Sequence, residues 1–184
     1  MGVRDQLTAA TADLMRRHGV AGTGVSEILR TSGVARRSIY LNFPGGKSEL
    51  VTAATRTAGS SVTLMLKKFM TKPDPFAAFA AMWSKVLTSS DFESGCPVVA
   101  AALGRSEAPA AADAAAELFR EWGGVIAGRL TEDGIDDQVA DSLATTIVAA
   151  VEGAVIMSQA AGSTKPLEQV VVHIRELIEL HSLR

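Results

Sequence analysis

The stretch TGVSEILRTSGVARRSIYLNFPGGKSEL, residues 23–50, has the pattern of two short helices joined by a tight turn. The spacing of its apolar residues predicts helices over 25–32 and 36–42. Gly33, between them, can take the left-handed backbone conformation that ends a helix and permits a short turn. The apolar side chains expected to hold this unit together are Ile28, Ile39 and Phe43. These features predict a helix-turn-helix.

The outer face of the second helix carries side chains that suit a DNA major groove. At about 100° per residue, Arg37 and Leu41 point away from the inner face, flanked by Tyr40. Arg37 can donate two hydrogen bonds to guanine, and Leu41 can contact a thymine methyl group. Tyr40 and Lys47 can hold phosphates. The alternative is a solvated basic face with a half-buried tyrosine. The residues predicted to bind DNA are Thr23, Arg36, Arg37, Ser38, Tyr40, Leu41, Asn42 and Lys47.

Positive charge is concentrated at the same end of the chain. The first 50 residues contain seven Lys and Arg against four Asp and Glu, a net charge of +3. The rest of the chain contains 11 basic and 16 acidic residues, a net charge of −5. A basic segment joined to an acidic body suits a molecule that contacts phosphates at one end.

The whole chain predicts an all-α fold. Ala and Leu dominate, and Gly or Pro recurs at helical intervals. We expect an N-terminal helix-turn-helix domain over 1–48 and a larger helical domain over 49–184. Nine helices and no strand are expected, over about 2–18, 25–32, 36–42, 46–70, 75–88, 97–105, 109–134, 137–159 and 166–181.

Residues 23–50 resemble the TetR family of transcriptional regulators, in which the recognition helix ends Tyr-x-x-Phe-Pro before a Lys and a Glu. The matching residues are Thr23, Val25, Ile28, Gly33, Val34, Tyr40, Phe43, Pro44, Lys47 and Glu49. The segments FPGGK at 43–47, GCPVVAAAL at 95–103 and VEGAVIMSQA at 151–160 are similar to the LmrA/YxaF branch of that family. The resemblance implies a repressor with a DNA-binding head and a ligand-binding body.

Some positions depart from the family pattern. Family members often carry Gly at the position of Arg37 and His or Tyr at the position of Leu41, so a relative's base preference does not transfer. Gly24 replaces a hydroxyl residue often found before the first of the two helices. Glu27, three residues later, is expected to reach back to the free amides at that helix start.

Other kinds of site have weaker support. The segment 45–48, GGKS, ends like a phosphate-binding loop, but Leu41 stands where that motif needs Gly and a helix precedes it. The three histidines lack partners at a metal-site spacing, and no GxSxG motif is present. We therefore predict no catalysis, metal or cofactor. Cys96 is expected to be a small buried residue, the alternative being an oxidant-sensing thiol at a helix start.

The cellular setting expected from the sequence is the cytoplasm. No apolar run reaches the roughly 18 residues that span a bilayer, so no membrane association is expected. The N-terminus lacks the pattern of a signal peptide. A single cysteine fits a reducing compartment.

Aromatic and Met residues recur beyond residue 50 among many Ala and Gly, which are too small to fill a helical interior. Each such residue most often belongs to a core, but together they predict an apolar cavity for a small hydrophobic effector. The LmrA/YxaF resemblance implies aromatic ligands such as flavonoids or antibiotic-like compounds. The residues predicted to bind the effector are Met65, Phe69, Phe79, Met82, Trp83, Phe119 and Trp122.

The last two predicted helices carry continuous apolar stripes. Because one short recognition helix contacts few bases, we expect a two-fold dimer that binds a palindrome with half-sites about 34–36 Å apart. Either stripe could instead pack on its own domain. The residues predicted for the dimer interface are Ile147, Val151, Val155, Val170, Ile174, Leu177 and Ile178.

Together these features predict a homodimeric repressor that binds operator DNA and is released by a ligand. One alternative is an activator on the same fold. Another is a helical small-molecule-binding protein or enzyme whose N-terminal unit binds no DNA.

Overall fold

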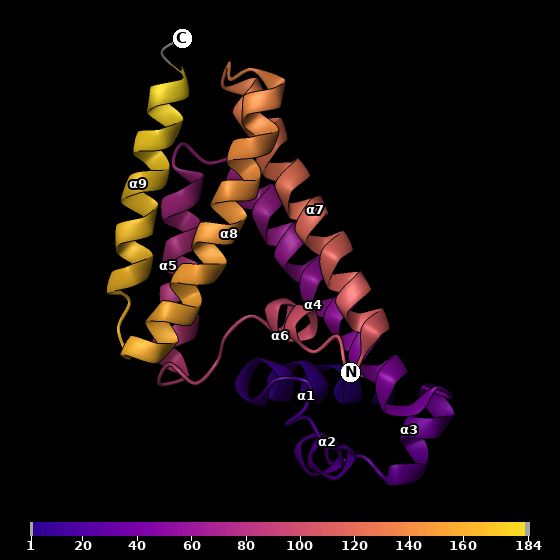
Figure 1. Ribbon diagram of the computed structural model, residues 1–184. Coiled ribbons are helices and arrows are strands. Elements are labelled where there is room, and N and C mark those ends of the chain that lie inside the picture. Colours follow the sequence, from indigo (N-terminus) through magenta and orange to yellow (C-terminus); the bar gives the residue numbers. More distant parts are fainter. Residues whose placement is uncertain (1, 183–184) are drawn as a thin grey trace. The chain divides into compact units, whose positions relative to one another are not determined.

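The computed structural model describes residues 2–182, and in this range the chain forms nine α-helices and no strand (Figure 1). The all-α fold is confirmed, and every helix end lies within two residues of its expected position. The helices are α1 (Val3–His18), α2 (Val25–Ser32), α3 (Arg36–Asn42), α4 (Gly46–Met70), α5 (Pro75–Ser89), α6 (Pro97–Leu103), α7 (Pro109–Glu132), α8 (Asp137–Ala161) and α9 (Lys165–Ser182).

Local capping interactions explain where several helices begin and end. Asp74 accepts a hydrogen bond from the amide of Ala77 at 2.9 Å. Pro75 occupies the first position of α5, where its missing N–H would have had no helical partner. Asp136 caps α8 by accepting hydrogen bonds from amides in its first turn. Gly162 ends α8 in the left-handed conformation, with a φ of 57°. These caps act within a few residues, so the sequence alone predicts them.

The described residues form two compact units, and neither is one continuous segment. The first comprises the chain up to Ser61 together with Cys96–Leu118. The second comprises Val62–Gly95 and the chain from Phe119 onward. Helices α4 and α7 each begin in the first unit and end in the second. The predicted division between residues 48 and 49 falls inside the first unit, and it stays a prediction about function.

The core of the first unit joins α1, α2, α3 and the beginning of α4. Its buried side chains are Leu7, Leu14, Ile28, Ile39, Phe43 and Leu50. Helix α6 also packs against α1. The chain at Gly104 comes so close to the α1–α2 turn that an added Cβ would lie 2.6 Å from Cγ2 of Val20. Only glycine fits that approach without moving the turn.

Two contacts join α4 to α7 within the first unit. Arg56 Nη1 donates a hydrogen bond to Glu117 Oε2 at 2.7 Å, and both side chains are about half exposed. One turn further along, Gly59 lies against Leu118, where an added Cβ would be 2.2 Å from a methyl carbon of the leucine. Gly59 therefore lets the two helices approach each other closely.

In the second unit α8 and α9 run side by side, and α5 packs against both (Figure 1). The loop between α4 and α5 is held by two other helices. Arg129 on α7 donates hydrogen bonds to the carbonyls of Met70 and Lys72. Arg175 on α9 pairs with Asp74. The end of α4 is thereby attached to α7.

Helix α8 is, within residues 2–182, the one helix long and apolar enough to cross a membrane by length and composition. The expectation of no membrane association stays a prediction. The helix carries Asp137, Asp141 and Glu152, and it packs against α5 and α9. Core helices of globular proteins pass the same test, and we interpret α8 as one of them.

Candidate nucleic-acid interface and effector site

The turn of the helix-turn-helix is built around Gly33. Its φ of 69° and ψ of 13° are left-handed, as predicted, and its amide donates to the Leu29 carbonyl at 3.0 Å. The predicted role of Glu27 is wrong, because its carboxylate accepts a hydrogen bond from Arg30 Nε at 3.1 Å instead of reaching back to the α2 amides. This hydrogen bond, together with the positive charge of Arg30, lowers the pKa of Glu27.

Helix α3 presents two arginines, a tyrosine and a leucine to solvent. Ile39, on its inner face, is fully buried. Leu41 is 69% exposed and Tyr40 is 53% exposed, and Arg36 and Arg37 are exposed beside them. A leucine that is exposed between charged and aromatic side chains contributes no hydrophobic free energy to folding. It does suit a surface that meets thymine methyl groups while the arginines meet base edges or phosphates.

The end of α3 is held by the first turn of α1. Arg4 Nη1 donates to the carbonyl of Asn42, and the Arg4 guanidinium carbon lies 4.2 Å from the centroid of the Phe43 ring. The Asn42 side chain folds back and donates to the Ser38 carbonyl at 2.8 Å. Ser38 and Asn42 are half-buried, so their contacts with DNA stay predictions. Arg4 is a positioning residue that no local spacing in the sequence indicates.

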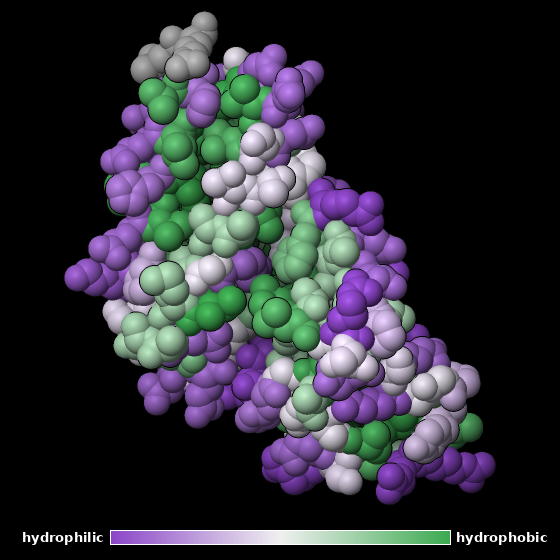
Figure 2. All heavy atoms as spheres, in the orientation of Figure 1, coloured by the Kyte–Doolittle hydropathy of each residue, from purple (hydrophilic) through white to green (hydrophobic). Residues whose placement is uncertain are grey.

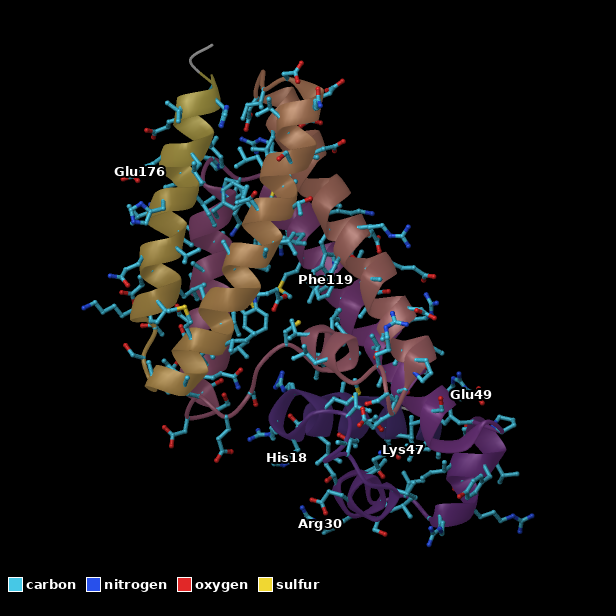
Figure 3. All side chains as sticks on the ribbon, viewed as in Figure 1. His18, Arg30, Lys47, Glu49, Phe119 and Glu176 are labelled. Atoms are coloured by element: carbon cyan, nitrogen blue, oxygen red, sulfur yellow. The ribbon has the colours of Figure 1, made fainter. Side chains whose placement is uncertain are left out.

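Thr23 and Lys47, both predicted to contact DNA, meet at the carbonyl of Val20. That carbonyl accepts from the Thr23 amide at 3.1 Å and from Lys47 Nζ at 3.2 Å. Thr23 is fully buried, and its hydroxyl donates to the Gly19 carbonyl at 2.7 Å. A buried, internally bonded Thr23 cannot reach a phosphate, so its predicted role is corrected to holding the α1–α2 turn. Half-buried Lys47, labelled in Figure 3, ties α4 to the same turn.

An apolar cavity lies in the second unit among α4, α5, α7 and α8. Its volume is about 20 Å³, which is room for about one water molecule. Of the seven predicted effector residues, Phe79 and Trp122 line it. Its full lining is Leu66, Met70, Phe76, Phe79, Trp122, Ile126, Ile147, Val148, Val151 and Glu152. The sequence analysis predicted only two of these lining residues. Glu152, an acidic residue within an apolar stretch of α8, is a sequence signal that could have indicated this position.

A groove of about 640 Å³ adjoins the cavity, between α7 and α8. Phe119, labelled in Figure 3, is the predicted effector residue that lines it. The Phe119 and Trp122 rings pack edge to face, with centroids 5.3 Å apart. Val148 and Glu152 line both the groove and the cavity. The two spaces are therefore separated by shared side chains.

The other four predicted effector residues line neither of these spaces: Met65, Phe69, Met82 and Trp83. Trp83 is only 4% exposed and belongs to the core. Phe69 packs edge to face against Phe79, a residue of the cavity wall, with ring centroids 6.2 Å apart. Direct effector contact by these four residues stays a prediction.

Much of the predicted dimer stripe faces inward. Four of its residues are buried inside their own chain: Ile147, Val151, Val155 and Ile174. Their assignment to the interface is wrong, because they pack within the helical unit, and Ile147 and Val151 also line the cavity. Leu177 is 38% exposed, whereas Val170 and Ile178 are half-buried.

Other apolar side chains on the same two helices do face solvent. They are Ile156, Met157, Val172 and Leu180, each between 48% and 60% exposed. Figure 2 shows hydrophobic surface along the side where α8 and α9 lie. We define these four residues with Leu177 as the α8–α9 apolar surface.

Chemistry of other kinds has little support. Within the described residues, His, Cys, Asp and Glu side chains form no group of three that could hold a metal ion. Cys96 is buried, which agrees with its predicted packing role.

Two family models match the chain over most of its length. The family of bacterial regulatory proteins named tetR matches residues 7–54, a range that contains most of α1, all of α2 and α3, and the beginning of α4. The LmrA/YxaF-like C-terminal domain of transcriptional regulators matches residues 74–173.

Individual proteins agree with both matches. An uncharacterized HTH-type transcriptional regulator of Mycobacterium tuberculosis is 31% identical, over 96% of this chain and 94% of its own length. The HTH-type transcriptional regulator LmrA of Bacillus subtilis is 26% identical, with 96% of each chain covered. The crystal structure of a TetR transcriptional regulator from Legionella pneumophila shares the fold, with a TM-score of 0.83 at 19% identity over 96% of this chain and 97% of that one.

The chain therefore belongs to the TetR family of helix-turn-helix transcriptional regulators, which are not enzymes. Within that family, its C-terminal domain is of the LmrA/YxaF type.

Proposed function

We propose that this regulator is a homodimeric repressor that a small hydrophobic effector releases from a palindromic operator. The observation that carries the proposal is the exposed face of α3, where Arg37 and Leu41 stand outward from a helix anchored by buried Ile39. Residues 1–48 form the DNA-binding domain in this proposal, and 49–184 form the effector-binding and dimerisation domain. The protein acts where the chromosome is, in the bacterial cytoplasm.

Direct base reading falls to Arg37 and Leu41. A guanidinium can donate two parallel hydrogen bonds to guanine, and an apolar side chain can contact the thymine methyl. Exposed Tyr40 and Arg36 are placed to contact phosphates beside the groove. Lys47 already donates to Val20, but an ammonium group carries three donors, so it can hold a phosphate without releasing the turn.

Dimerisation is assigned to the α8–α9 apolar surface. Isologous contact between two copies would bury Met157 and Leu180, which are now 60% and 57% exposed, and would form a four-helix bundle. A two-fold dimer places two copies of α3 for successive major grooves, about 34–36 Å apart.

The effector is assigned to the cavity and its adjoining groove. At about 20 Å³ the cavity is far below the roughly 300–1,000 Å³ of ligand sites, so binding has to displace its walls. Those walls include Leu66 and Met70 near the end of α4, and Trp122 and Ile126 on α7. Ligand binding therefore favours a state in which both helices have shifted.

Helices α4 and α7 also carry that shift to the first unit. They are joined there by the ion pair of Arg56 with Glu117 and by the close packing of Gly59 on Leu118, so they move as a pair. Since α4 follows α3 directly in the chain, movement of α4 changes the distance between the two α3 helices of the dimer. The effector relieves repression only through its higher affinity for the shifted state.

A gel-shift titration with the DNA upstream of its own gene, repeated at increasing salt, tests the proposal. We expect tight binding that weakens steeply as salt rises, because phosphate contacts release counterions. Binding that is unmeasurable at low salt would refute DNA regulation and favour a ligand-binding protein without operator contact. A reporter gene under the same DNA separates repression from activation: deletion of the regulator raises expression if it is a repressor.

A further inference from the structure

A buried hydrogen bond joins α7 to α4 beside the apolar cavity. Trp122 on α7 is 2% exposed, and its indole Nε1 donates to Oγ1 of Thr63 on α4 at 3.1 Å. Thr63 is 3% exposed, so the bond lies away from water, where a hydrogen bond is electrostatically stronger than at the surface. Both residues belong to the second unit. The bond therefore fixes the position of the indole relative to α4.

Trp122 is also part of the cavity wall. On α4, Leu66 and Met70 line the same cavity. They follow Thr63 by three and seven residues, so the three side chains share one face of the helix. The hydrogen bond therefore lies about one helical turn from the cavity along α4.

The ring of Trp122 is in contact with the groove as well as the cavity. It packs edge to face against Phe119, with ring centroids 5.3 Å apart. Half-buried Phe119 lines the groove of about 640 Å³. A ligand in the groove that displaces Phe119 therefore acts on the Trp122 ring through this contact.

The cavity cannot enlarge at Trp122 without losing the hydrogen bond. At about 20 Å³ the cavity has room for about one water molecule, so an aromatic ligand has to displace wall side chains. The apolar contacts of Leu66 and Ile126 tolerate small shifts, because hydrophobic contact has no preferred direction. A hydrogen bond depends on distance and angle, and an increase of about 0.5 Å in its length of 3.1 Å would break it.

We propose that the hydrogen bond from Trp122 to Thr63 regulates the effector site: it stabilises the closed cavity, and it breaks when an aromatic ligand displaces the indole. This inference rests on the proposed effector site, and it names a contact that opposes the opening of that site. Because the bond is present in the closed state and lost in the ligand-bound state, its removal by mutation should tighten ligand binding. A bond with a purely structural role would persist in both states, and its removal would leave ligand affinity unchanged.

Isothermal titration calorimetry on the full-length protein without DNA, with 1-naphthol as the probe, tests this role. Thr63→Val removes the hydroxyl and keeps the branched shape of the side chain. It should tighten naphthol binding about fivefold, as the net contribution of one hydrogen bond allows. Thr63→Ser keeps the hydroxyl and should restore the affinity of the wild type.

Thr55→Val is the matched control. Thr55 is also buried on α4, but its hydroxyl donates to the Val51 carbonyl of the same helix, at 2.9 Å. This variant should bind 1-naphthol as the wild type does. Equal affinity of Thr63→Val and the wild type, an equal gain in Thr55→Val, or no binding of 1-naphthol to any of these proteins would overturn the proposal.

Nuclear magnetic resonance observes the bond itself. The chain contains two tryptophans, so protein labelled with ¹⁵N gives two indole N–H signals, and Trp83→Phe identifies the one from Trp122. In the free proteins this signal should differ between the wild type and Thr63→Val. At saturating 1-naphthol the two signals should coincide, because residue 63 no longer contacts the indole.

Two outcomes of this measurement contradict the proposal. A difference between the two proteins that persists at saturation would show that the bond survives ligand binding. A Trp122 signal of the wild type that does not move at saturation would show the same, and this second comparison needs no variant at position 63.

The role of the bond and the regulatory function fail separately. Because neither measurement contains DNA, failure of the gel shift would refute the repressor and leave the role of the bond standing. Conversely, operator binding that persists while Thr63→Val binds 1-naphthol like the wild type would refute the role of the bond alone.

Discussion

The guanidinium of Arg4 lies over the ring of Phe43, with its central carbon 4.2 Å from the ring centroid. Arg4 is in the first turn of α1, and Phe43 is the residue at which α3 ends. The same guanidinium donates to the Asn42 carbonyl, one of the carbonyls that a helix end leaves without a partner. The helix expected to read bases is thus held at its end by the beginning of α1.

Replacing Arg4 with Ala removes both contacts and is expected to weaken operator binding about tenfold, equivalent to ~1.4 kcal/mol, because α3 is less firmly positioned. Arg16→Ala is the control, since it removes the same charge from α1 and Arg16 bonds to Asp13 of its own helix. Gel-shift titration gives both affinities. Equal losses in the two variants would mean that net charge, not positioning, explains the effect.

The roles of Arg37 and Lys47 can be separated by operator variants. Arg37→Ala should reduce discrimination between base-substituted operators by about 1–3 kcal/mol, because a bidentate base contact is lost. Lys47→Ala should weaken all sequences similarly. It should also lower the melting temperature, since the contact with the Val20 carbonyl is lost. Competition binding measures the discrimination, and uniform losses in both variants would contradict the base-reading role of Arg37.

A charge on the α8–α9 apolar surface should break the dimer. Met157→Glu is expected to raise the dimer Kd at least about a hundredfold, because burying an unpaired carboxylate costs several kcal/mol. Leu103→Glu is the control, because Leu103 is 80% exposed on α6 and belongs to the other unit. Analytical ultracentrifugation measures the monomer fraction. A Met157→Glu protein that stays dimeric would place the interface elsewhere.

The close approach of Gly59 to Leu118 predicts a coupled pair of substitutions. Gly59→Ala should lower the free energy of unfolding by about 1–3 kcal/mol, since its methyl group collides with the leucine. Leu118→Ala alone should cost about 2–5 kcal/mol through the cavity that it leaves. In the double variant the new methyl group enters that cavity, so the combined loss should be smaller than the sum. Chemical denaturation measures all four proteins, and additive losses would show that the helices separate freely.

The sequence predicts the helices well because their ends depend on nearby residues. The capping groups of Asp74, Asp136 and Gly162 bond to amides and carbonyls a few positions away. Gly33 ends α2 through its own left-handed backbone conformation. The exposed α3 residues Arg37 and Leu41 also follow from local spacing, because Ile39 fixes the inner face.

The sequence predicts less well which apolar face meets which neighbour. On α8 the stripe containing Ile147 and Val151 has the periodicity of an interface, but the same periodicity serves internal packing, and here it lines the cavity. Contacts such as Arg4 with Phe43, or Lys47 with Val20, join residues 39 and 27 positions apart. Such contacts depend on how helices pack, and that information is spread over the whole chain.

The packing of Gly59 on Leu118 also constrains how this protein can change over generations. A side chain at position 59 collides with the leucine while Leu118 keeps its full length. A lineage that substitutes position 59 first therefore passes through a destabilised intermediate, whereas one that shortens residue 118 first opens space for the second change. The order of the two mutations therefore decides whether this pair of positions can change without a loss of stability. The pair lies where α4 packs against α7.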